Sequence, residues 1–154
     1  FMNDNLFDHV NIDKANTHVP NGHADDLEEE AVRYESFIQS LGGIDLQLLG
    51  IGHNGHIGFN EPTDNFPATV HTVQLTESTI NANSRLFERR EDVPTQAITM
   101  GIGTIMKAKK ILLIAGPDKA EIVEKACFGK VTPEVPASVL QLHPDVTVIL
   151  SAGK

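Results

Sequence analysis

Short apolar runs alternate with amphipathic stretches along most of the chain. Residues 44–52, 111–116 and 146–153 are apolar at most positions, and turn-forming residues bound them. Strands of this kind are buried on both faces, which is typical of a parallel sheet. Residues 69–75 and 96–103 are two further strand candidates. The pattern therefore predicts a sheet built largely of buried strands.

Between these runs, apolar residues recur at helical spacing. In residues 21–43, acidic side chains crowd the first turns, two glycines follow the last turn, and one face is formed by Leu27, Ala31, Tyr34, Ile38 and Leu41. Further, shorter helices are predicted at residues 76–89, 104–110, 117–129 and 135–144. The alternation predicts an α/β fold: one Rossmann-like domain over residues 1–154, with a mostly parallel sheet and helices on both faces.

Charge and composition narrow the possible partners. The 154 residues carry 12 Lys and Arg against 21 Asp and Glu, a net charge of -9, which argues against nucleic acid. No apolar run approaches the roughly 20 residues of a membrane span. The single cysteine, Cys127, cannot form a disulfide within the chain and fits the cytoplasm. Neither a dinucleotide fingerprint nor a phosphate loop with its lysine is present, so we expect no cofactor.

A dense polar cluster follows the first buried strand. The stretch "LLGIGHNGHIGFNEP", Leu48 to Pro62, ends an apolar run in glycines and then places two histidines, two asparagines and a glutamate together. Ligands in open α/β sheets bind at the carboxyl ends of the strands, which is where this cluster begins. Its glycines would let the backbone pass close to a ligand or turn sharply. We therefore predict a small-molecule site here.

His56 is the candidate for proton transfer, with Glu61 five residues further on. A carboxylate beside an imidazole holds its tautomer and raises its basicity, which suits acid–base chemistry near neutral pH. Two alternatives stay open from the residues alone. His56 could be a hydrogen-bonded core histidine, or His53, His56 and Glu61 could bind a metal. Because no cysteine pair or further histidine cluster supports a metal site, we expect none.

The motif "GIGHNGHIGFNEP" closely resembles that of the glucosamine-6-phosphate deaminases, also called isomerases. The likeness continues in order through "NLFDHVNI", "NSRLF", "ITMGIGTIM", "AGPDKA" and "VPASVLQLHP". The related 6-phosphogluconolactonases typically carry "DGH" followed by small residues and Phe-Pro instead of "IGFNEP". Several ordered blocks around a long motif make the resemblance to the deaminases specific.

The resemblance implies an enzyme of amino-sugar metabolism, in the breakdown of N-acetylglucosamine, that converts glucosamine 6-phosphate and water to fructose 6-phosphate and ammonia. It implies that His56 moves the proton that opens the sugar ring, that Glu61 polarises His56, and that Asn54 orients the histidine or a sugar hydroxyl. It further implies that Arg85 and Lys119 contact the phosphate. We also expect Gly55, together with Arg85 and Lys119, to take part in substrate binding.

By the same resemblance, the chain corresponds to the C-terminal two-thirds of a deaminase, without the family's phosphate loop and acidic motif. We therefore expect the polypeptide alone to be inactive. Three alternatives remain: a galactosamine-6-phosphate enzyme, a lactonase-like hydrolase, and a non-catalytic module that binds sugar phosphates. Family members are hexamers or monomers, so a homo-oligomer is possible.

Overall fold

The computed structural model describes residues 1–153, and the side chains of all of these except Ser78, Ala82 and Asn83. The helices are α1 (Met2–Asn5), α2 (Leu27–Ser40), α3 (Glu77–Asn83), α4 (Ile102–Met106) and α5 (Ala120–Phe128). The strands are β1 (Leu46–Leu49), β2 (His71–Gln74), β3 (Gln96–Thr99), β4 (Lys110–Ala115) and β5 (Val146–Leu150). The predicted alternation of strands and helices is confirmed.

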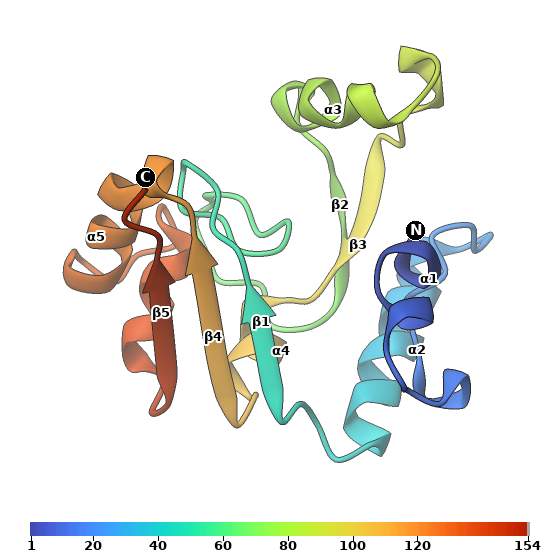
Figure 1. The fold of residues 1–154 in the computed structure, drawn as a ribbon, viewed down its shortest axis with the longest axis horizontal. Helices are drawn as coiled ribbons and strands as arrows, with labels where there is room; N and C mark the ends of the chain where they lie inside the picture. The colour runs from blue at the N-terminus through green and yellow to red at the C-terminus, as the bar shows by residue number, and fades with distance from the viewer. Residues whose placement is uncertain (154) are drawn as a thin grey trace.

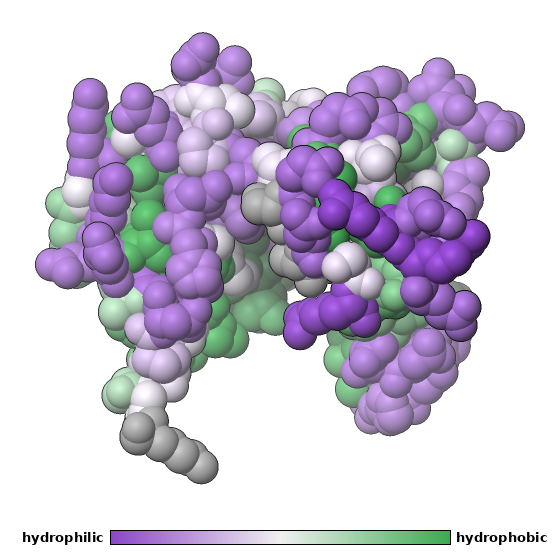
Figure 2. Space-filling model, turned by 90° about the horizontal axis from the view of Figure 1, so that it is seen from above, coloured by the Kyte–Doolittle hydropathy of each residue, from purple (hydrophilic) through white to green (hydrophobic). Residues whose placement is uncertain are grey.

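Three strands form a parallel sheet in the order β1-β4-β5. Their arrows point the same way in Figure 1, so their carboxyl ends meet at one edge of the sheet. Figure 2 looks down on this end of the molecule, where hydrophilic side chains dominate the surface and the face is hollowed between its two sides. The mostly parallel α/β fold predicted from the apolar runs is confirmed, and the first polar loop leaves the sheet at this end.

One face of the sheet carries the core. Ile111 and Leu113 of β4 are each 1% exposed and pack with residues of α4, α5 and η6 (Pro136–Leu142). The other face differs from the prediction of helices on both faces. Leu48 of β1 and Ile114 of β4 are exposed there, so within residues 1–153 the helical layer covers one face only.

The other two strands leave the parallel sheet. β2 and β3 pair antiparallel, with His71 opposite Thr99 and Gln74 opposite Gln96. They extend away from the parallel sheet and lead to α3 at their far end (Figure 1). We call β2, β3 and the segment between them the arm. Neither strand alternates cleanly between buried and exposed positions. The sequence predicted both strands but not their pairing.

Helix α2 is capped at its first turn and joined to the arm. Asp26 accepts hydrogen bonds from the amides of Glu28 and Glu29 and so caps the first turn. In the middle of the helix, Glu35 is 7% exposed. It accepts hydrogen bonds from the Val70 amide (3.1 Å), the Thr104 hydroxyl (2.7 Å) and Gln39 (3.0 Å). A buried carboxylate therefore links α2 to the start of β2 and to α4.

Candidate active site

The loop after β1 brings together three of the predicted site residues. The His56 imidazole Nδ1 lies 2.8 Å from Asn54 Oδ1 and 3.3 Å from Glu61 Oε1. Asn54 Nδ2 donates to Glu61 Oε2 at 2.6 Å, which closes a ring of three contacts. Main-chain hydrogen bonds from Gly52 to the His56 carbonyl and from Gly55 to the Gly52 carbonyl fold the loop back on itself. We call Asn54, His56 and Glu61 the histidine cluster.

The histidine cluster selects one tautomer of His56. Because the Asn54 amide nitrogen donates to the glutamate, its oxygen must face the imidazole. His56 Nδ1 therefore carries the hydrogen and donates to Asn54 Oδ1, with Glu61 Oε1 beside it. This arrangement leaves Nε2 as the nitrogen that can accept a proton from a bound molecule.

The His56 ring is neither packed in the core nor fully solvated. Its side chain is 31% exposed and Glu61 is 26% exposed. The ring borders an open pocket of about 360 Å³, together with Gly50, Ile51, Gly52 and Gly58. The pocket lies at the carboxyl end of β1, where ligands of α/β sheets bind. The interpretation of His56 as a core histidine is therefore wrong.

Two glycines allow the ring and loop to sit this way. A Cβ at Gly52 would lie 2.2 Å from His56 Cε1, so only glycine lets the ring occupy its position. Gly55 has a φ of 87°, which favours glycine, and a Cβ there would lie 2.7 Å from a methyl carbon of Val135. These close approaches explain the glycine spacing of the motif. The assignment of Gly55 to substrate binding stays a prediction.

Lys119 lies beside a second pocket. It is the last residue of η5 (Pro117–Lys119), directly before α5, and its side chain is 18% exposed. Its ammonium is 2.8 Å from Asp118 Oδ2 and within 2.8 Å of the His53 ring. The hydrogen bond from Lys119 lowers the pKa of Asp118. A cation is thus held at the carboxyl end of β4 by a carboxylate and an imidazole.

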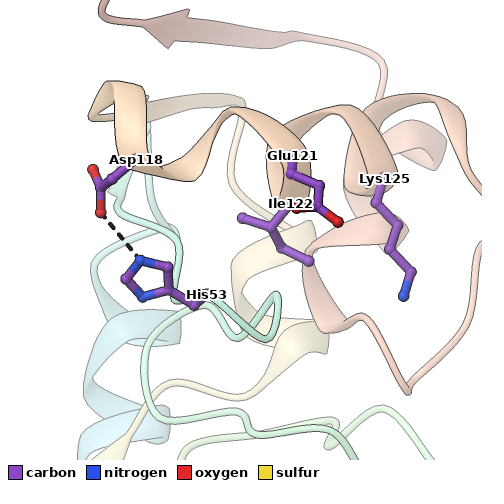
Figure 3. A pocket seen from close by; sticks show the side chains of 5 residues that line it. All are labelled: His53, Asp118, Glu121, Ile122 and Lys125. Carbon is purple, nitrogen blue, oxygen red and sulfur yellow. Dashed lines mark ion pairs between the residues drawn. The ribbon is translucent and has the colours of Figure 1, made fainter. Parts of the chain in front are cut away.

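Figure 3 shows this second pocket, which has a volume of about 210 Å³. His53 points from the loop toward Asp118, with Nε2 3.1 Å from Oδ2, while Glu121, Ile122 and Lys125 project from α5. His53 therefore contacts Asp118 and Lys119 and does not join His56 and Glu61. Within residues 1–153, no three His, Cys, Asp or Glu side chains are grouped to hold a metal ion.

Arg85 lies far along the arm. It is exposed in η3 (Ser84–Leu86), directly after α3, and none of the described contacts joins it to Lys119 or to the histidine cluster.

The sequence did not predict the contact between His53 and Lys119. Those residues come from loops after different strands, and only the pairing of β1 with β4 brings them together.

A parallel α/β sheet with a tethered, pocket-facing imidazole at its carboxyl edge defines a class of protein suited to acid–base chemistry on a small molecule. The chain matches a known family over residues 1–149, described as glucosamine-6-phosphate isomerases/6-phosphogluconolactonase. The chain belongs to this family. Among the described residues, no helix is long and apolar enough to cross a membrane.

Individual relatives carry the name glucosamine-6-phosphate deaminase. The chain is 67% identical to one from Lachnoclostridium phytofermentans and 59% identical to one from Clostridioides difficile, over 97% of its own length. It covers 64% and 61% of those proteins, so it spans about three-fifths of the curated relatives that it matches.

Solved structures agree with these relatives. A monomeric glucosamine-6-phosphate deaminase superposes with a TM-score of 0.91 at 49% identity, over 98% of this chain and 63% of that one. A 6-phosphogluconolactonase from Thermotoga maritima gives a TM-score of 0.69 at 20% identity, over 99% of this chain and 63% of that one. The second likeness concerns the fold alone.

Proposed function

We propose that the protein carrying this chain is a glucosamine-6-phosphate deaminase, which converts glucosamine 6-phosphate and water to fructose 6-phosphate and ammonia. The observation that carries the proposal is the His56 ring, fixed through Nδ1 by Asn54 and Glu61 while Nε2 is left to accept a proton. The high identity to proteins of that name supports the choice of substrate. The reaction belongs to amino-sugar breakdown, and we place it in the cytoplasm.

In the proposed reaction His56 opens the sugar ring. Its Nε2 takes the proton of the anomeric hydroxyl and returns a proton to the ring oxygen as the bond from that oxygen to the anomeric carbon breaks. The imidazolium that forms between these transfers is stabilised by the Glu61 carboxylate, 3.3 Å from Nδ1. A positioned acid–base group contributes about 10²–10⁴-fold to rate.

Lys119 and Arg85 are proposed to bind the phosphate of the substrate. Lys119 is largely buried, and its ammonium faces the polar groups of Asp118 and His53. A phosphate would replace these neighbours as a stronger acceptor for a cation. Arg85 is exposed on the arm, away from Lys119 in the chain. To bind the same anion, its side chain would have to reach it from the arm.

The test is release of ammonia from glucosamine 6-phosphate by the protein that carries this chain. Galactosamine 6-phosphate is assayed in the same way, and 6-phosphogluconolactone is assayed by its hydrolysis to the acid. We expect His56→Ala to lower kcat by about 10²–10⁴-fold with little change in stability. His9→Ala is the matched control, because that ring contacts the Asp4 carbonyl near the N-terminus. Preference for the lactone, or an unchanged rate in His56→Ala, would contradict the proposal.

A further inference from the structure

A short turn separates the two ionisable groups of the histidine cluster. Residues 57–60 form it, and the main-chain N–H of Asn60 donates to the Ile57 carbonyl at 3.2 Å. His56 directly precedes the turn and Glu61 directly follows it. Ile57 is 0% exposed, so the start of the turn is anchored in the core. The placement of the turn therefore decides whether the Glu61 carboxylate meets the imidazole.

The Asn60 side chain fixes that placement. It is 2% exposed, and Nδ2 donates to the Ile57 carbonyl at 2.9 Å and to the Met100 carbonyl at 2.8 Å. Because both neighbours are carbonyls, only the amide nitrogen fits between them, so the orientation of the amide is settled. The Thr99 hydroxyl accepts a further hydrogen bond from the Phe59 amide at 3.0 Å. The turn is thus fastened to the end of β3.

The same side chain also carries an energetic cost. Among the described residues, Asn60 Oδ1 is buried without a hydrogen-bond partner. An unpaired buried acceptor costs about 1–3 kcal/mol, which offsets part of what the two hydrogen bonds donated by Nδ2 contribute.

We infer that Asn60 is a positioning residue of the active site, an inference that rests on the proposed function. One N–H group closes the turn onto the Ile57 carbonyl and the other ties the turn to the Met100 carbonyl directly after β3, so that Glu61 stays in contact with His56 Nδ1. Asn60 does not touch the substrate, because its side chain is enclosed by protein. Its loss should therefore change the chemical step and leave substrate binding nearly unchanged.

The experiment compares two buried amides. Asn60→Leu removes both donors at similar volume. Gln47→Met is the matched control, since Gln47 of β1 is 8% exposed and also has an unpaired buried oxygen. We expect Asn60→Leu to lower kcat by about 10²-fold, the usual effect of a 1 Å misplacement, with KM within about threefold. Gln47→Met should keep both constants within about threefold.

The ring signals of His56, followed by NMR, should shift in Asn60→Leu and stay in place in Gln47→Met. Equal losses in the two variants, an effect on KM alone, or an unshifted ring would overturn the inference. If Asn60→Leu does not fold, Asn60→Ser is judged by the same criteria, and failure of both to fold would also overturn it. A wild-type protein that releases no ammonia contradicts the proposed function instead, and the NMR comparison then decides the role of Asn60.

Discussion

Replacing Gly52 by alanine tests the geometry of the histidine cluster with a single methyl group. The new Cβ would lie 2.2 Å from Cε1, 2.4 Å from Nδ1 and 2.5 Å from Nε2 of the His56 ring. Because carbon atoms pack at about 3.5–4.0 Å, the ring must move by about 1 Å or more. Gly52 has no positive φ, so its backbone itself accepts alanine.

The displacement should affect rate far more than stability. A ring that moves this far loses its 2.8 Å contact with Asn54 and its 3.3 Å contact with Glu61. We expect kcat to fall by about 10²-fold. The free energy of unfolding should change by less than about 1 kcal/mol, because the ring is partly exposed at a pocket and can rotate.

The measurements are ammonia release, denaturant unfolding and the NMR signals of the His56 ring. Gly22→Ala is the matched control, because a Cβ there would meet no atom within 4 Å, its φ is not positive, and it lies outside the His56 pocket. Gly22→Ala should therefore keep the wild-type rate and ring signals. A Gly52→Ala protein with the wild-type kcat and an unmoved ring would refute the geometric reasoning.

Two further predictions concern buried or paired carboxylates of α2. Glu35→Ala leaves the Val70 amide without its acceptor and the Thr104 hydroxyl with only the Ala68 carbonyl at 3.5 Å. The change should cost about 1–3 kcal/mol in urea unfolding, and a change under about 0.5 kcal/mol would contradict this. Glu30 has its pKa lowered from 4.5 to about 2, chiefly by its hydrogen bond with Arg33. Since the unfolded chain then binds the proton more readily, stability should fall as pH drops from about 4.5 toward 2. Glu30→Gln should flatten that part of the thermal-unfolding profile, and an equally steep decline in the variant would disprove the link.

The sequence predicted the elements well where local rules decide them. Helix α2 has a capping aspartate, acidic first turns and terminal glycines, and β4 is a continuous apolar run. The antiparallel pairing of β2 with β3 was not predicted, because strand propensity does not name a partner. The burial of Glu35 was also not predicted, because an acidic residue in a polar helix is expected to face solvent. The packing of the arm against α2 is what buries it.

The candidate site divides in the same way. Asn54, His56 and Glu61 lie close in sequence, and a loop that folds back on itself brings them together. By contrast, the contact between His53 and Lys119 depends on β1 lying beside β4. Contacts made across strands require the assembled sheet.

All members of the histidine cluster come from one uninterrupted segment, Asn54–Glu61. These residues stay together when a gene is duplicated or recombined, and the distant partners that hold their turn are Thr99 and Met100. The segment between β2 and β3 and the α5 end of the sheet are separate stretches of chain and can diverge around this unit. A lineage can therefore acquire new ligands by altering those outer parts while keeping the same proton-handling device.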